Sequence, residues 1–318
     1  MKKASAAAAF LLIAFVASYY FTCLWFELNW EFRWAPWGDL IRGTAPTPFQ
    51  YRALVPWLAR SVCAPPPAGL ALVGIRPFLF WLECGAVLLF TIAFAWHLRA
   101  FFPARLAWPL SLSVFLVLPF NFLLDRTLAL RYPSDPPSLL FFTLGLALIR
   151  RRRWALFYPL FAVATLNRET TLFLAAVYLF AAWGVEPRPR VGGRLLALLV
   201  IWGAVKAFLW GIYRCNPGDG MMQGHVVRNL AFIADPKLWP LLVSNLGYLW
   251  IPLLLFRRRI SDGFARRSSL VLYPFLAAMF LVGNMVELRI YGELIPVALT
   301  GVLLLLRDHP LPRGTGRL

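Results

Sequence analysis

The sequence predicts an all-α, polytopic membrane protein with about ten transmembrane helices. The 318 residues are 60% hydrophobic and 16% aromatic, and the mean hydropathy of +0.68 lies well above that of soluble globular domains. Apolar runs recur along the whole chain, separated by short charged clusters. These runs are continuous rather than alternating, which indicates helices rather than barrel strands, the two structures that satisfy backbone hydrogen bonds in lipid.

The apolar runs define the predicted transmembrane segments. Together they predict one integral membrane domain, 1–318, with no internal repeat and no soluble domain. In chain order they are 4–26, 77–97, 106–124, 137–149, 154–166, 170–185, 195–213, 240–256, 270–286 and 294–306. Lys2 and Lys3 precede the first segment, as in a signal peptide. That apolar stretch is long for a signal peptide, at roughly 22 residues, and no small-x-small cleavage site follows it. We therefore expect an uncleaved anchor.

The charges predict which side of the membrane each loop occupies. More than half of the 32 basic residues, among them Arg150–Arg153, fall in loops on the same side of the membrane as the N-terminus. Most of the 14 acidic residues fall in loops on the opposite side. The positive-inside rule then places both termini in the cytoplasm and the carboxylates outside, in a bacterial cytoplasmic (inner) membrane. We attribute the net charge of +18 to basic residues that set this topology and contact membrane lipids. We therefore expect no nucleic acid as a partner.

A charged turn interrupts the apolar run 154–185, which reads "LNRET" at its middle. Each arm of this hairpin reaches only roughly 20–24 Å, less than the hydrocarbon thickness of about 30 Å. Segment 137–149 is equally short, so these helices predict a basin open to the outer leaflet with Arg168 and Glu169 on its floor. Ionisable groups at this depth usually mark a pathway or a site. The alternative is that Arg168 and Glu169 cap the turn and neutralise each other.

Two stretches outside the membrane extend this basin. The loop "LLDRTLALRYPSDPPS" adds Asp125, Arg131, Tyr132 and Asp135. The first outer loop, 27–76, carries the tryptophans of an interfacial segment. Within it, 50–62 has the spacing of an amphipathic helix lying in the interface, with one face formed by Tyr51, Leu54, Val55, Leu58 and Val62. Arg52 is then available to a lipid phosphate, although snorkelling to headgroups is an alternative for such arginines.

Two later outer loops offer further phosphate-binding candidates. Loop 214–239 contains "HVVRNLAFIAD", which predicts a short helix with His225, Arg228 and Asn229 on its polar face. The short loop "VELRIYGELIP" holds Arg289 between two glutamates. The alternatives are a solvated helix face for the first set and a structural Arg–Glu pair for the second.

Two more charges lie within predicted spans. Glu83 and Lys206 are each about seven residues, or roughly 10 Å, from the outer end of their helix. Because an unpaired charge at that depth is costly, we expect them to form a buried pair.

The first outer loop resembles that of the integral-membrane GT-C glycosyltransferases, above all glycosyltransferase family 87 and the polyprenol-dependent mannosyltransferases. The matching residues are Asp39 in "WGDLIRG" and the stretch "PFQYRALVPW", and the "NRET" turn between short helices is also similar. The residue-level match covers roughly 20 residues, and the likeness in topology extends along the chain.

The resemblance implies transfer of a sugar from a polyprenyl-phosphate donor to an acceptor at the outer face, on a GT-C-like fold with interfacial helices in the first outer loop. A carboxylate would take the proton from the acceptor hydroxyl, and the resemblance points to Asp39, with Glu31 and Asp125 in reserve. Cations would hold the departing lipid phosphate. The lipid-linked sugar is the substrate, and no cofactor is expected; no residue is assigned as a metal ligand, and the need for a divalent metal stays open.

Two other functions stay open at this point. Transporters and flippases commonly contain inverted repeats and polar groups near the midplane, whereas this chain gathers carboxylates at one face. A non-catalytic partner in envelope assembly would keep its phenotype when Asp39 is replaced by asparagine.

Overall fold

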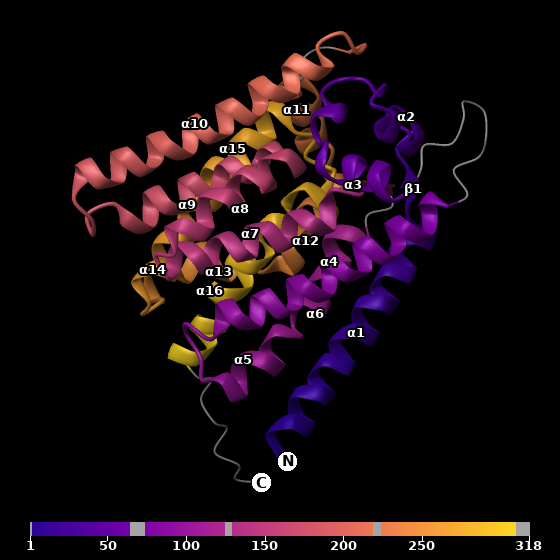
Figure 1. Ribbon diagram of the computed structural model, residues 1–318. Coiled ribbons are helices and arrows are strands. Elements are labelled where there is room, and N and C mark those ends of the chain that lie inside the picture. The colour runs from indigo at the N-terminus through magenta and orange to yellow at the C-terminus, as the bar shows by residue number, and fades with distance from the viewer. Residues whose placement is uncertain (1, 64–73, 125–128, 219–223, 310–318) are drawn as a thin grey trace.

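The computed structural model describes residues 2–63, 74–124, 129–218 and 224–309, and these form a bundle that is almost entirely helical. In Figure 1, the start of α1 (Lys2–Leu28) and the end of α16 (Ile295–Asp308) lie at the same end of the bundle. Helices α2 (Trp37–Arg42) and α3 (Leu54–Val62) lie at the opposite end. The predicted catalytic reserve Asp125 lies outside the described residues.

Six helical stretches of the described chain are long and apolar enough to cross a membrane, so the chain is a multi-pass helical membrane protein. They are α1, α4 (Ile75–Leu98), α5 with α6 (Ala104–Ser111 and Val114–Phe122), α10 (Arg188–Tyr213), α14 with α15 (Gly263–Ser268 and Leu272–Val282), and η7 with α16 (Leu288–Leu294 and Ile295–Asp308). A broken pair adds up to one more. The predicted count of about ten spans is therefore not confirmed.

The broken pair is built from short pieces that bend by 70° between 236–248 and 250–259. The pieces are η3 (Pro236–Leu238), α12 (Trp239–Ser244), η4 (Asn245–Tyr248), α13 (Trp250–Phe256) and η5 (Arg257–Arg259). Leu246, Gly247 and Tyr248 all have positive φ, which ends the helix at this point. Asn121 holds the bend, because its side-chain oxygen accepts the Leu246 N–H at 3.2 Å.

Short helices surround the charged turn, as the sequence predicts. Helix α7 (Asp135–Arg150) has 16 residues, α8 (Trp154–Asn167) has 14 and α9 (Phe173–Ala182) has 10, or roughly 24, 21 and 15 Å. Arg168 ends α8 in an extended conformation, and the 3-10 helix η2 (Glu169–Leu172) starts the return. Helix α7 packs against α4 on one side and α8 on the other.

The first loop folds onto the end of the bundle. Strand β1 (Trp30–Glu31) pairs in parallel with β2 (Leu130–Arg131), so that Glu31 lies opposite Arg131. Gly43 ends α2 with φ 83°, a conformation that favours glycine. The 3-10 helix η1 (Phe49–Tyr51) leads into α3. Within the predicted apolar face of this segment, Tyr51 and Val55 are buried whereas Leu58 and Val62 are exposed, and its position in the membrane interface stays a prediction.

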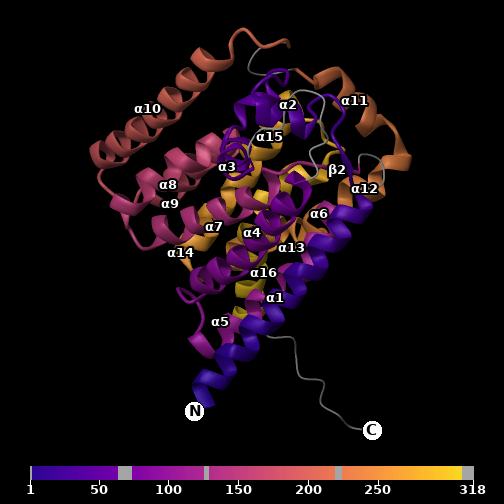
Figure 2. The ribbon, with the colours of Figure 1, turned by 45° about the vertical axis from the view of Figure 1, so that its right-hand side comes forward.

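The basic turns gather at one end of the molecule, which we call the basic end. The Arg150 side chain lies 2.9 Å from the Asp262 carboxylate, Arg151 donates to the Trp96 carbonyl, and Arg307 donates to the Phe101 carbonyl. Turns far apart in sequence therefore meet here. We call the opposite end, with α2, α3, β1, β2, η2 and η7, the loop end (Figures 1 and 2).

The spans differ in how far the protein covers them. In an apolar 18-residue stretch of each span, 89% of the residues are buried in the span that ends with α16, against 17% in α10. Helix α10 runs along the outside of the bundle, next to α8 and α9 (Figure 1). Its apolar side chains therefore face the surroundings, and α16 forms the centre.

Candidate charge cluster at the loop end

Asp135 is the centre of a buried charge cluster at the loop end. It lies at the first turn of α7, where the helix dipole favours an anion, and it is 1% exposed. Arg168 donates to Asp135 Oδ1 at 2.9 Å, and Arg289 donates to Asp135 Oδ2 at 3.0 Å. The charged turn, the start of α7 and the 3-10 helix η7 therefore meet on one carboxylate.

Two glutamates of the η7 region complete this side of the cluster. Glu287 accepts from Arg289 at 2.5 Å. Glu293 lies 3.6 Å from Arg168 Nε and accepts from the Thr170 hydroxyl at 2.5 Å. The sequence predicts neither glutamate as a site residue, although both lie within four residues of Arg289. The structural Arg–Glu pair considered for this loop is therefore present, within a larger network.

Arg52, Glu169 and Lys206 form the outer side of the cluster. Glu169 lies 2.9 Å from Arg52 and 3.7 Å from Lys206. Burial lowers the pKa of Arg52, but the nearby Glu169 carboxylate outweighs it, so the pKa of Arg52 is raised overall. One prediction is wrong here, because Lys206 pairs with Glu169 rather than with Glu83. The alternative considered for the charged turn does not hold either, because Arg168 and Glu169 bind different partners rather than each other.

The formal charges of the cluster balance. The cations are Arg52, Arg168, Lys206 and Arg289, and the carboxylates are Asp135, Glu169, Glu287 and Glu293. A further anion would therefore be attracted by hydrogen-bond donors that the cluster leaves unused, rather than by a net positive charge.

Tyr132 lies where such donors meet. Its ring centroid is 5.1 Å from Arg52 Cζ and 4.8 Å from Arg289 Cζ, within the range of cation–π attraction. The rings of Phe32 and Phe49 pack against it. Within the described chain, the Tyr132 hydroxyl and the Nε atoms of both arginines are buried without a hydrogen-bond partner. Burial raises the pKa of Tyr132 despite the two guanidinium groups, so its hydroxyl keeps a proton to donate.

Arg131 points away from this cluster. Its guanidinium lies 3.5 Å from the Phe26 ring centroid and 4.4 Å from that of Trp37. Burial lowers the pKa of Arg131 to about 10, and the charge of Glu83 opposes that shift. Glu83 itself accepts from the Trp25 indole at 2.9 Å. Tyr132, the next residue, points to the charge cluster, because successive side chains of an extended chain alternate.

The predicted catalytic acids lie on the first loop. The Asp39 carboxylate, in the first turn of α2, is 2.6 Å from Arg42, and both side chains are partly exposed. Glu31 accepts from the Trp37 backbone N–H. In the described chain, neither acid forms an ion pair with the charge cluster. The role of Asp39 as a base stays a prediction.

Loop 214–239 contains the predicted short helix, α11 (Val226–Ala234), but one residue of its predicted polar face is buried. Asn229 is buried and donates to the carbonyls of Phe280 and Gly283 at 2.8 and 2.7 Å. Val227 and Leu230 are exposed. His225 and Arg228 therefore lie beside an anchoring asparagine, and the structure does not bring them to the charge cluster.

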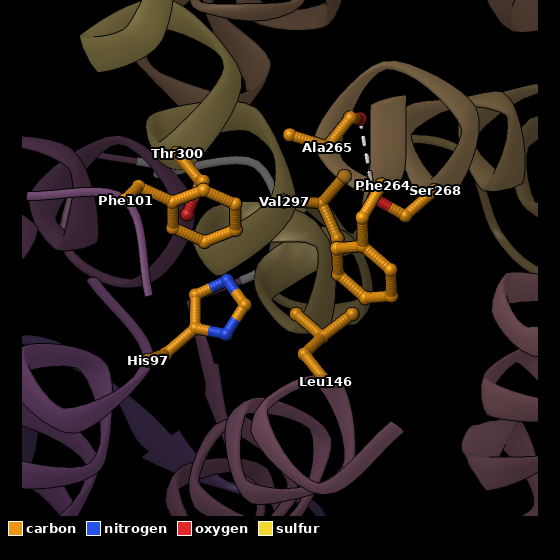
Figure 3. A pocket seen from close by; sticks show the side chains of 8 residues that line it. All are labelled: His97, Phe101, Leu146, Phe264, Ala265, Ser268, Val297 and Thr300. Carbon is orange, nitrogen blue, oxygen red and sulfur yellow. Dashed lines mark hydrogen bonds between the residues drawn. The ribbon is translucent and has the colours of Figure 1, made fainter. Parts of the chain in front are cut away.

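A small cavity lies near the C-terminal end of α4. Its volume is about 10 Å³, and in Figure 3 the His97 imidazole lies beside Phe101 and Thr300. The remaining lining residues are Leu146, Phe264, Ala265, Ser268 and Val297. Such a volume is about that of one water probe, so this cavity does not hold a substrate.

Among the residues that the structure describes, no group of three or more His, Cys, Asp or Glu side chains is arranged to hold a metal ion. No protein-family model matches the chain, and no curated protein or solved structure matches it. These comparisons therefore do not test the resemblance to GT-C glycosyltransferases, which stays a hypothesis.

Proposed function

We propose that the protein is a membrane glycosyltransferase of GT-C type that moves a sugar from a polyprenyl-phosphate donor to an acceptor. The reaction would take place at the loop end, facing away from the cytoplasm of a bacterial cell, with both termini inside. One observation carries the proposal. Tyr132, Arg52 and Arg289 lie side by side at the loop end and keep buried N–H and O–H donors that no group of the described chain accepts.

Such donors suit a phosphate oxygen. Leaving a buried donor unused costs roughly 1–3 kcal/mol, so three in one place indicate a missing acceptor. Arginine N–H groups bind phosphate strongly because the hydrogen bonds are charge-assisted. The aromatic rings of Phe32 and Phe49 beside Tyr132 would keep water from the phosphate and strengthen these bonds.

A lipid-linked substrate also suits the position of the cluster. Lys206 joins the cluster from α10, the span that the protein covers least. A donor could therefore keep its isoprenoid tail in the bilayer beside α10 while its phosphate reaches Arg52. The lipid holds the reacting groups near the interface, which supplies proximity.

The proposed reaction needs one base and one leaving group. The acceptor hydroxyl oxygen bonds to the anomeric carbon while the bond from that carbon to the lipid phosphate oxygen breaks. The hydroxyl proton passes to a carboxylate, which the resemblance assigns to Asp39, and the bonding electrons leave with the phosphate as polyprenyl phosphate. Arg52, Arg289 and Tyr132 would stabilise the charge that develops on the departing oxygen.

A deletion strain tests this function. Its outer-face glycans are profiled and then compared after complementation with wild type, Asp39→Asn, and Arg214→Gln as an exposed control at the same end of the molecule. We expect deletion to remove one sugar, Arg214→Gln to restore it, and Asp39→Asn to fail. An unchanged glycan in the deletion strain would reject the enzyme. Full rescue by Asp39→Asn would reject Asp39 as the base, as expected of a non-catalytic assembly protein.

A further inference from the structure

A cavity of about 330 Å³ lies at the basic end, in the turn between α9 and α10. It is lined by Trp183, Gly184, Val185, Glu186, Pro187, Arg188 and Val191. Trp183 and Val185 are 62% and 52% exposed, and Val191 is buried. The cavity thus has an apolar wall that faces outward, next to the first turn of α10.

The acidic residue in this lining is already paired. Arg194 lies 2.7 Å from one Glu186 oxygen, and Arg152 lies 3.8 Å from the other. The Tyr178 hydroxyl contacts Glu186 as well, at 3.2 Å. Glu186 therefore gives the cavity no unbalanced negative charge, and it joins the α7–α8 turn to the α9–α10 turn.

The cations around the cavity exceed its acids. Arg188 is part of the lining, Arg152 is 64% exposed on the side chain, and Arg153 and Arg190 are exposed nearby in sequence. Basic pockets between apolar helices on the cytoplasmic side attract anionic headgroups. A tryptophan next to them marks the depth of the membrane interface.

We infer that this cavity binds one anionic phospholipid, with its phosphate between Arg152 and Arg188 and the start of its acyl chains against Trp183 and Val185. The apolar wall selects a lipid over a soluble phosphate compound, because Trp183 and Val185 gain nothing from a headgroup alone. The cationic rim selects an anionic lipid over a zwitterionic one. The site is independent of the sugar transfer proposed for the loop end.

Native mass spectrometry of the full chain in detergent tests this inference with three probes: dioleoyl phosphatidylglycerol, dioleoyl phosphatidylcholine and glycerol 3-phosphate. We expect one phosphatidylglycerol to bind more tightly than phosphatidylcholine, and glycerol 3-phosphate not to compete. The double variant Arg152→Gln/Arg188→Gln should weaken phosphatidylglycerol binding about thirtyfold. The matched control Arg60→Gln/Arg214→Gln, with exposed arginines at the loop end, should leave binding unchanged.

The variant Trp183→Ala keeps every charge and checks the apolar wall. It should weaken phosphatidylglycerol binding without changing the preference over phosphatidylcholine. Equal binding of the two lipids by wild type, or an unchanged affinity in Arg152→Gln/Arg188→Gln, would overturn the inference. Competition by glycerol 3-phosphate at the affinity of the whole lipid would show a headgroup site and overturn the lipid assignment.

Discussion

Replacing Asp135 by asparagine should destabilise the protein more than any other single loss of charge at the loop end. The side chain keeps its size, but two arginines lose their shared anion. Arg168 and Arg289 are 2% and 6% exposed on the side chain, so little water reaches them to replace the carboxylate. One arm of the new amide must also point its N–H₂ group at a guanidinium.

The structure sets the expected magnitude. Removing one partner of a buried ion pair costs about 3–5 kcal/mol. At roughly 2 °C per kcal/mol for a chain of this size, the apparent Tm of Asp135→Asn should fall by about 6–10 °C. Asp39→Asn is the matched control, because the Asp39–Arg42 pair is 37–40% exposed and such pairs contribute about 0–1 kcal/mol.

The assay is thermal unfolding of both variants in one detergent at one heating rate, because unfolding of membrane proteins is commonly irreversible. The double variant Asp135→Asn/Arg289→Gln should lose less stability than the sum of its single changes, by about 0.5–3 kcal/mol. If Asp135→Asn unfolds at the same temperature as Asp39→Asn, or if the double variant is strictly additive, Asp135 does not hold the cluster together.

Other side chains give further tests. Arg52→Gln removes one of the proposed phosphate donors, so sugar transfer measured by the outer-face glycan assay should fall at least about tenfold. Glu83→Leu leaves the Trp25 N–H unpaired and should cost about 1–3 kcal/mol in thermal unfolding, whereas Glu83→Gln keeps an acceptor and should cost less. Gly292→Ala places its Cβ 2.6 Å from the Phe122 ring and should cost about 1–3 kcal/mol by overpacking.

Each of these tests has a clear contrary result. Equal stability of Glu83→Leu and Glu83→Gln would mean that the indole hydrogen bond contributes nothing. Gly203 on α10 has open space around the Cβ position, so Gly203→Ala is the control for Gly292→Ala. If the two alanine variants unfold together, the η7 region is looser than its contacts indicate. Wild-type transfer by Arg52→Gln would remove that arginine from the proposed site.

Much of the charge cluster could be predicted from the sequence. Asp135, Arg168, Glu169 and Arg289 stand out because ionisable residues are rare and costly in so apolar a chain. The short helices beside the charged turn follow from counting apolar residues against the thickness of a bilayer. These signals are local, so one sequence suffices to read them.

The pairing of the charges could not be predicted, because it depends on how helices rotate about their axes. Equal depth suggested Glu83 as the partner of Lys206, but α10 presents Lys206 to Glu169 while Glu83 faces Trp25. Loop 214–239 shows the same limit, since the sequence predicts Asn229 on a polar helix face, but it is buried as an anchor to the Phe280 carbonyl. Hydropathy likewise does not register the bend at Gly247, where a run of positive φ separates two short apolar helical stretches.

Tyr132→Phe offers the most direct test of the phosphate site, because it removes a single oxygen that has no partner in the described chain. The wild type and the variant would be compared by thermal unfolding and by binding of farnesyl phosphate in detergent. The proposal predicts that Tyr132→Phe is at least as stable as wild type and binds farnesyl phosphate about 5–30 times more weakly. Equal affinity of the two proteins would contradict it.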